Sequence, residues 1–522
     1  MNKCVKVNYR SFFAVAGVYL LLPVLIFFAG YLKIPVAAAC VAVTCLIGYL
    51  AFRDSNRAPD RSLMEDCVTI PVKFIVIASV FAVCVTVITG VGELVWTTYD
   101  HAFRRAILND LINYKWPVIY QPETQMNPDV RQMITSQAPQ GFIYYFTYWM
   151  PAALTGKLFG FTAANIFLIL WNSLGIVLII IGISIYVRRN SYASMFVLLC
   201  FSGLDVIPYY INQIWLNIDE QWMWVDGCVP HMSFVSNFNN MENVYHQAIP
   251  CYLIIILLLT ARNNRSTGLI GSLMFAYSPW ATFGMIVPCI VQLFNGRYRT
   301  GDRRRNIRNI LSPCNIVMPV IILIIYGAFY MAKADSASDR GFTWEYYGSI
   351  GKFIPAYLIL LAVEVLPVAA LVFSKRRKDP MFWGAIILLL LCPLYKITES
   401  NDFTMRASMP GLFILAVFLV KLISDYSEED TKLARQNKKR KGIAANLKLA
   451  ALSVVLVGMA YVTYFMLSVI IPGTFMSSDR PENHIVSFGN QATPYYTEKI
   501  SDQFFSENPY DTLFFKYLGK KV

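Results

Sequence analysis

Long apolar runs limit what this chain can fold into more than any other feature of its sequence. Of its 522 residues, 56% are hydrophobic and 15% are charged, whereas soluble domains carry roughly 25% charged residues. Several runs reach the roughly 20 residues needed to cross the hydrocarbon core of a bilayer. Because backbone groups in lipid must pair within their own segment, the sequence predicts an all-α polytopic membrane protein with about 11–13 transmembrane helices.

The candidate spans follow from these runs. We place them at about 11–32, 34–52, 70–91, 163–187, 193–211, 245–260, 311–333, 353–373, 381–397, 407–424 and 448–471. The run 267–294 is interrupted by Ser278-Pro279-Trp280 and is predicted to be a helical hairpin. The segment 142–160 is rich in tyrosine, which is typical of the membrane interface, so we expect an interfacial or membrane-dipping helix there.

Positive charge is gathered in short clusters between the apolar runs, and this predicts the orientation of the chain. The net charge is +13, and the clusters include 297–308, 375–378 and 435–441. Such clusters are typical of cytoplasmic loops. Aromatic residues do not interleave with them as they do in proteins that bind single-stranded nucleic acid, so we expect no nucleic-acid partner.

With the basic clusters inside, the chain divides into a bundle and an outer tail. Residues 1–471 form the transmembrane bundle, with outer loops at about 92–141, 212–244 and 334–352, and 472–522 form an extracytoplasmic C-terminal segment. All four histidines then lie on the outer face: His101, His231, His246 and His484. Cys228 is the only cysteine placed outside, and the cysteines show no metal-ligand spacing.

The loop after the third predicted span opens with an unusually polar stretch, residues 99–110. If this stretch is helical, it contains two i,i+4 pairs: Asp100 with Arg104 and His101 with Arg105. Asp110 would lie about 80° around the helix from Asp100 at 3.6 residues per turn. A positioned carboxylate can act as a general base, and guanidinium forks suit phosphate. We therefore predict Asp100 and Asp110 as catalytic residues and His101, Arg104 and Arg105 as substrate-binding residues; the alternative is an interfacial helix with surface ion pairs.

A second polar group follows the span predicted at 381–397. Asp402 and Arg406 are one helical turn apart, and an arginine at the outer mouth of a helix bundle is a good ligand for a lipid phosphate. We predict substrate-binding roles for Lys396, Asn401, Asp402 and Arg406. The alternative is a salt bridge at a helix end with snorkelling side chains.

Two further groups are candidates for substrate binding. Asp205 and Glu364 are ionisable residues inside predicted spans, where such groups are functional candidates, although a buried structural hydrogen bond is the alternative. The segment 212–247 has no lysine or arginine and combines acids, amides and tryptophans, which suits sugar as well as an interfacial aromatic belt. Its candidates are Asp219, Glu220, His246 and Gln247. There is no P-loop, HExxH, GxSxG or dinucleotide fingerprint, so no nucleotide cofactor is indicated.

Together these motifs resemble the GT-C superfamily of integral-membrane glycosyltransferases. The resemblance rests on an acidic motif in a large outer loop before Pro139-Gln-Gly-Phe-Ile-Tyr-Tyr145, on the many spans and on the cationic residues at the outer face. More specifically, several segments look like signatures of a bacterial group of such proteins: 100–117, 201–205, 218–222, 243–250, 277–279 and 401–410.

The resemblance implies an enzyme of the bacterial cytoplasmic membrane with its active site on the extracytoplasmic face. It would transfer a sugar, with inversion, from a polyprenyl-phosphate-linked donor to an acceptor glycan or lipid. Asp100 would be the general base, and Arg406, with Lys396 or Arg105, would hold the leaving lipid phosphate. Many GT-C enzymes carry an Asp-Glu or Asp-x-Asp pair, whereas His101 follows Asp100 here, so the use of a divalent ion (Mg²⁺ or Mn²⁺) and the identity of the catalytic carboxylate stay open.

The main competing interpretation is a polytopic transporter or lipid flippase for cell-envelope glycan precursors; the others are another envelope glycan enzyme that shares the lipid substrate, such as a polymerase or ligase, and a catalytically silent assembly subunit. In a transporter, Asp205 and Glu364 would be the coupling sites. Transporters often show repeated halves and broken helices, and this sequence shows no internal repeat. The large outer loops favour an enzyme.

Overall fold

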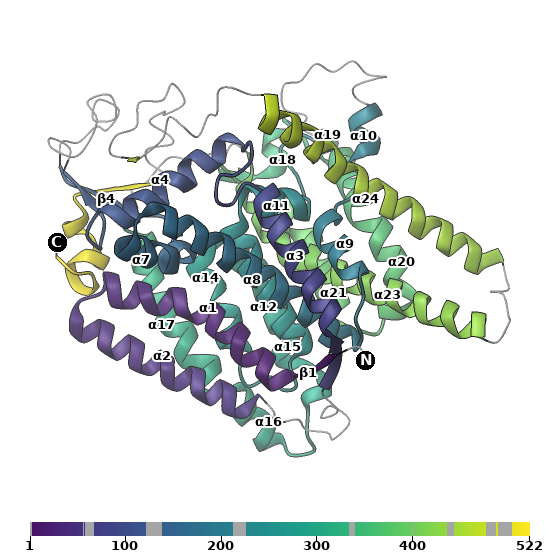
Figure 1. Cartoon of the computed structure of the whole chain (residues 1–522), viewed down its shortest axis with the longest axis horizontal. Coiled ribbons are helices and arrows are strands. Elements are labelled where there is room, and N and C mark those ends of the chain that lie inside the picture. Colours follow the sequence, from purple (N-terminus) through teal and green to yellow (C-terminus); the bar gives the residue numbers. More distant parts are fainter. Residues whose placement is uncertain are drawn as a thin grey trace.

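A bundle of helices makes up most of the described chain (Figure 1). The computed structural model describes residues 3–55, 57, 67–121, 138–211, 226–333, 340–398, 400–435, 443–476, 487–488 and 504–521. Within these residues, seven helices are long and apolar enough to cross a membrane, and five shorter apolar helices accompany them. The multi-pass helical architecture predicted from the apolar runs is therefore confirmed, while the number of spans stays a prediction.

The long apolar helices include three that are made of more than one consecutive element. The seven are α1 (Tyr9–Tyr31), α2 (Ile34–Asp54), α8 (Phe161–Val187), α16 with α17 (Arg303–Ile310, Pro313–Tyr330), α19 with α20 (Ile350–Leu360, Leu366–Arg376), α22 with α23 (Asp402–Ala407, Met409–Arg435) and α24 (Ile443–Met476). The shorter ones are α3 (Val72–Ile88), α12 (Tyr245–Thr260), α13 with α14 (Thr267–Ser272, Met274–Tyr277), α15 (Pro279–Phe294) and α21 (Pro380–Leu391). The predicted break at Ser278 is confirmed, because its side chain caps α15 by accepting a hydrogen bond from the Ala281 amide at 3.2 Å.

The other elements of the described chain are short. The remaining helices are α4 (Tyr99–Asn113), α7 (Met150–Phe159), α9 (Ala193–Cys200), α10 (Val206–Tyr210), α11 (Asn237–Asn243) and α18 (Thr343–Tyr346). Three small antiparallel sheets pair β1 (Cys4–Asn8) with β2 (Cys67–Pro71), β4 (Gln140–Phe142) with both β3 (Ile119–Tyr120) and β7 (Phe505–Glu507), and β5 (Arg340–Phe342) with β6 (Tyr395–Ile397). The sequence did not predict these strands, because each is too short to show a period.

The continuous span predicted at 193–211 is wrong. Helix α9 ends at Cys200, and the chain is extended before α10 begins at Val206. The break occurs where this backbone crosses the π-helical segment Leu361–Val365: the Leu204 amide donates to the Val363 carbonyl at 3.1 Å. A side chain at Gly203 would come within 2.8 Å of the Glu364 Cα atom. This close tertiary approach, rather than local propensity, interrupts the helix.

The segment 142–160 does not contain a spanning helix. Its helix α7 has 10 residues, which at 1.5 Å per residue is about half the thickness of the hydrocarbon core. The preceding residues form β4 and a 3₁₀ turn over Thr147–Trp149. The structure therefore supports the predicted short helix in place of another span.

Helix α12 lies at the centre of the bundle. It packs against α1, α8 and α23, and every residue from Tyr245 to Leu259 is buried. A helix that is apolar on all sides is typical of such a position. The first turn of this helix carries His246 and Gln247, so these polar side chains are held at one end of the core.

The C-terminal tail packs against the bundle. Strand β7 pairs with β4, and the Lys520 amide donates to the Tyr31 carbonyl at 2.9 Å. Figure 1 shows the C-terminus beside the end of α1. The predicted C-terminal segment 472–522 thus begins inside α24, and its described part is joined to the bundle.

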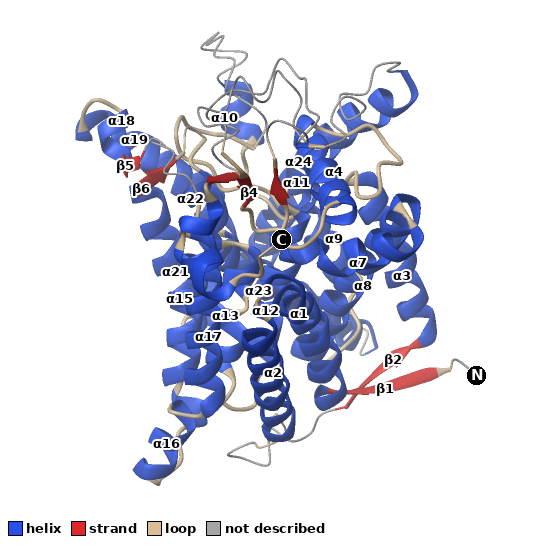
Figure 2. Ribbon diagram, turned by 90° about the vertical axis from the view of Figure 1, so that its left-hand side faces the viewer, coloured by secondary structure: helices blue, strands red, loops and turns tan. Residues whose placement is uncertain are grey.

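The two ends of the bundle carry different short elements (Figure 2). One end, which we call the α4 end, carries α4, α11 and α22. The opposite end carries α16 and is called the α16 end. The clusters of positive charge predict that the α16 end faces the cytoplasm.

Candidate functional site

Helix α4 presents a carboxylate and a guanidinium on one stripe. The Arg104 Nη2 atom lies 3.3 Å from the Asp100 Oδ2 atom, so the predicted i,i+4 pair is confirmed. The Asp100 side chain is 50% exposed, whereas that of Arg104 is 8% exposed. Arg104 Nε has no hydrogen-bond partner among the described residues. The pair thus combines an accessible carboxylate with a buried cation that has unused donors.

Contacts with α11 fix the position of α4. The Thr98 hydroxyl donates to the Asn243 side-chain oxygen at 2.8 Å, and the His101 ring hydrogen-bonds to the Glu242 backbone. Burial, and then the nearby Arg104, lower the pKa of His101 to about 3. His101 is therefore a neutral ring packed behind α4.

The second predicted motif provides another buried arginine. Asp402 and Arg406 of α22 form the predicted i,i+4 pair, with 3.7 Å between Arg406 Nη2 and Asp402 Oδ1. Arg406 Nη1 also donates to the Asn240 Oδ1 atom, at 3.4 Å. The Arg406 side chain is 11% exposed. Both contacts are long for a guanidinium, so Arg406 could bind an added anion more tightly than it binds its present partners.

The fold brings both arginines into the surroundings of the same two aromatic rings. Arg104 and Arg406 both lie within electrostatic range of His246 and of Tyr145, and Asp402 is also within range of Tyr145. The Tyr145 ring is stacked on the His246 ring, with 5.9 Å between centroids. We call Asp100, Arg104, Tyr145, His246, Asp402 and Arg406 the paired-arginine site. The structure therefore joins two motifs that are about three hundred residues apart in the sequence.

Glu242 lies beside this site and was not predicted. It is buried, and neither carboxylate oxygen has a hydrogen-bond partner among the described residues. Burial, and then the negative charges of Asp100 and Asp226, raise its pKa to about 8. A neutral Glu242 could donate a hydrogen bond to a substrate oxygen. In the sequence it was one acid among several in a loop, and only the contact between α11 and α4 distinguishes it.

Arg105 points away from the paired-arginine site. The predicted pairing with His101 is wrong: Arg105 Nη1 lies 3.3 Å from Glu93 Oε2, and its guanidinium faces the Phe161 ring. Arg105 therefore anchors α4 to the start of α8.

Lys396 and Asn401 contact His231 close to α22. The Lys396 ammonium is buried over the Tyr346 ring at 4.1 Å and lies 3.3 Å from His231 Nδ1. The Asn401 amide donates to the His231 carbonyl at 2.7 Å, and its oxygen caps α22. Both residues thus position the helix that carries Arg406.

Asp110 lies at the far end of α4, ten residues and about 15 Å along the helix axis from Asp100. Its Oδ2 atom accepts hydrogen bonds from the Tyr120 hydroxyl at 2.6 Å and from the Phe488 amide at 3.0 Å. Burial raises its pKa from 3.8 to about 6. These contacts join α4 to the β3 strand and to the C-terminal tail, which indicates a structural role.

We expect Asp110→Asn to remove a pH dependence from stability. The folded state holds the Asp110 proton more tightly than the unfolded state, and this tighter binding adds to the free energy of unfolding. The added stability is complete below pH 3.8 and is lost as the pH rises through about 6. It corresponds to about 3 kcal/mol. An asparagine oxygen keeps both hydrogen bonds and does not titrate. The thermal midpoint of Asp110→Asn in detergent, measured relative to that of the wild type, should therefore rise from pH 4 to pH 7. A constant difference between the proteins, or a stable variant without activity, would contradict this role.

Three buried side chains inside the bundle could hold a metal ion. One ligand atom from each of Asp205, Cys228 and Glu364 lies within 4.8 Å of the others. The Asp205 and Glu364 carboxyl groups lie within hydrogen-bonding range of each other. A cysteine beside carboxylates suits zinc better than Mg²⁺ or Mn²⁺, the ions whose use the sequence left open. Without an ion, one proton shared by the two acids would relieve their repulsion.

The remaining predicted residues are placed only in part. Gln247 is buried beside His246, with 3.2 Å between their Nε2 atoms. Asp219, Glu220 and His484 lie outside the described residues. Five of the twelve predicted site residues that the structure describes therefore belong to the paired-arginine site: Asp100, Arg104, His246, Asp402 and Arg406.

Comparisons with known proteins add no assignment. No protein-family model, no curated protein and no solved structure matches this chain.

Proposed function

We propose that this protein is a membrane glycosyltransferase that takes a sugar from a polyprenyl-phosphate-linked donor. The observation that carries the proposal is the paired-arginine site. Its two nearly buried guanidiniums have weak or unused donors and both lie within electrostatic range of His246 and Tyr145, and one of them, Arg104, pairs with the half-exposed carboxylate of Asp100. Buried cations of this kind favour a bound phosphate. The apolar surfaces of the bundle helices can contact the polyprenyl chain of the donor.

The residues divide the proposed reaction between them. Asp100 removes the proton from an acceptor hydroxyl, whose oxygen then forms a bond to the anomeric carbon of the sugar. The bond from that carbon to the phosphate oxygen breaks, and polyprenyl phosphate leaves with the electron pair. Arg104 and Arg406 stabilise the charge that develops on the phosphate. Attack from the face opposite the leaving group inverts the anomeric configuration.

Aromatic side chains at the site suit a sugar ring. Tyr144 and Tyr145 are stacked, with 3.9 Å between ring centroids, and both are partly exposed. Glu242, kept neutral by burial, would donate a hydrogen bond to a sugar or phosphate oxygen. The acceptor, a glycan or lipid, would approach Asp100 from the α4 end, on the extracytoplasmic face of a bacterial cytoplasmic membrane.

Transfer can be tested with the full-length protein in proteoliposomes. We expect release of free polyprenyl phosphate and a glycosylated acceptor when the vesicles contain polyprenyl-phosphate glucose, mannose or galactose and envelope lipids as acceptors. Mass spectrometry measures both products. Movement of the labelled donor across the bilayer with its glycosidic bond intact would instead support a flippase.

A further inference from the structure

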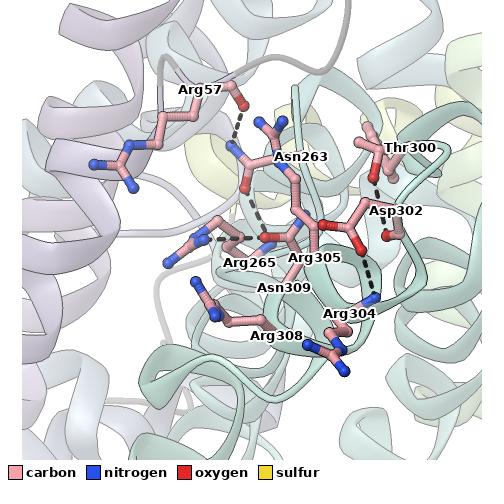
Figure 3. A pocket seen from close by; sticks show the side chains of 10 residues that line it. Arg57, Asn263, Arg265, Thr300, Asp302, Arg304, Arg305, Arg308 and Asn309 are labelled. Carbon is pink, nitrogen blue, oxygen red and sulfur yellow. Dashed lines mark hydrogen bonds between the residues drawn. The ribbon is translucent and has the colours of Figure 1, made fainter.

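The α16 end of the bundle contains a basic hollow that the proposed transfer reaction does not use. Its volume is about 370 Å³, and its lining includes Arg57, Arg265, Arg304, Arg305 and Arg308. Figure 3 shows these side chains around the hollow, with the Arg265 and Arg308 guanidiniums on the same side in that view. We call it the arginine hollow. The many positive charges need an explanation, because like charges repel when nothing binds between them.

The charges in the arginine hollow are only partly neutralised by the described chain. Asp54 is buried and pairs with Arg265 Nε at 2.8 Å and with Arg57 Nη1 at 3.3 Å. Asp302 also lines the hollow, where it accepts from the Arg304 amide at 2.8 Å. Arg304, Arg305 and Arg308 form no ion pair with a described residue. Five guanidiniums against the two carboxylates of Asp54 and Asp302 leave a charge of +3.

The network around Asp54 holds part of the hollow rigid before any ligand binds. Arg265 Nη1 donates to the Asn309 oxygen at 3.0 Å, and the Asn263 amide donates to the backbone oxygens of Asp54 and Arg57. Three chain segments are thereby joined at fixed positions. A preorganised set of guanidinium forks is suited to the oxygens of a phosphate group.

An apolar groove begins next to the arginine hollow. It has a volume of about 390 Å³ and is formed by α1, α2, α12 and α13. Its lining includes Phe52, five residues before Arg57, and Leu269, four residues after Arg265. Almost all of its surface is apolar, and Val18 and Tyr49 on its rim are exposed. A charged hollow beside an apolar groove has the chemistry of an amphiphile with an anionic head.

We infer that the arginine hollow binds a phosphate-bearing anion and that the adjoining groove accepts the acyl chains of an anionic membrane lipid. The exposed Ile307 and Leu311 beside the hollow fit this level of the membrane, because they would contact the acyl chains just below the phosphates. The inference concerns the end of the bundle opposite the paired-arginine site and does not rest on the proposed transfer.

The test is lipid binding to the delipidated full-length protein, measured by native mass spectrometry. Phosphatidylglycerol is the anionic lipid, phosphatidylcholine the zwitterionic control, and pyrophosphate the soluble probe. The test variant is Arg305→Ala/Arg308→Ala, and Arg299→Ala/Arg303→Ala removes the same charge from exposed residues that do not line the hollow.

We expect phosphatidylglycerol to bind more tightly than phosphatidylcholine, and the test variant to weaken this binding by about thirtyfold, from about 1 kcal/mol for each arginine near the surface. The affinity of the control variant for phosphatidylglycerol should fall by clearly less. Val18→Trp narrows the groove from its exposed rim. It should weaken the binding of phosphatidylglycerol but not the binding of pyrophosphate. Equal losses of phosphatidylglycerol affinity in the two double variants would overturn the inference that the arginine hollow is a specific binding site. Pyrophosphate binding without any preference for phosphatidylglycerol would show a soluble anion as the ligand and overturn the lipid assignment.

Discussion

Replacing Asp100 with asparagine is expected to lower the rate of sugar transfer by about 10²- to 10⁴-fold, the range of general-base catalysis. Asparagine keeps an oxygen near Arg104 but cannot accept the acceptor proton. Because the Asp100 side chain is half exposed, the thermal midpoint should change little. Initial rates of polyprenyl phosphate release, measured with the wild type and the variant in the same vesicles, provide the comparison.

Asp379 offers a matched control for this substitution. It pairs with Arg376 at 3.6 Å and caps α21, and asparagine is an equally good capping residue. It also lies outside the paired-arginine site. Asp379→Asn should therefore transfer sugar at the wild-type rate. If folded Asp100→Asn did the same, Asp100 would not be the base.

Replacing Arg406 with alanine is expected to lower transfer by about 10²- to 10³-fold, comparable to the loss of one donor that stabilises developing charge. It should also weaken inhibition by the product, polyprenyl phosphate, because the phosphate loses a buried guanidinium. Arg406→Lys should recover part of the rate, since lysine restores the charge but not the planar fork. Rates and inhibition constants in proteoliposomes measure these effects.

Arg189 provides the control for the loss of a guanidinium. It forms an ion pair with Glu428 and donates to the Ser424 carbonyl at 3.0 Å, outside the paired-arginine site. Arg189→Ala should remove an ion pair without changing product inhibition. Wild-type inhibition in a folded Arg406→Ala protein would show that the phosphate binds elsewhere.

Local sequence was sufficient for the features that depend on neighbouring residues. Apolar runs predicted α1, α2, α8, α12 and α17 to within a few residues, because burial in lipid requires a continuous apolar segment. Spacing along one helix also predicted the pair Asp100 and Arg104, which are four residues apart on one face. The same spacing failed for His101 and Arg105, since Arg105 pairs with Glu93 instead.

Contacts between distant segments decided the rest. Its residue type made Asp110 a candidate catalytic acid, but in the structure the β3 strand and the C-terminal tail supply its hydrogen bonds. Glu242 became a candidate only because α11 packs against α4, and Asp205 met Cys228 and Glu364 only where two backbones cross.

The sequence by itself determined that this is a multi-pass helical protein whose basic clusters and histidines lie in different segments of the chain, because hydrophobic length and charge are properties of single segments. Only the tertiary structure decided that Arg104 and Arg406 share His246 and Tyr145 as neighbours. The shared neighbours of the two arginines depend on how α4, α12 and α22 pack. Packing between helices that are distant in the chain leaves no periodic signal in the sequence of any one of them.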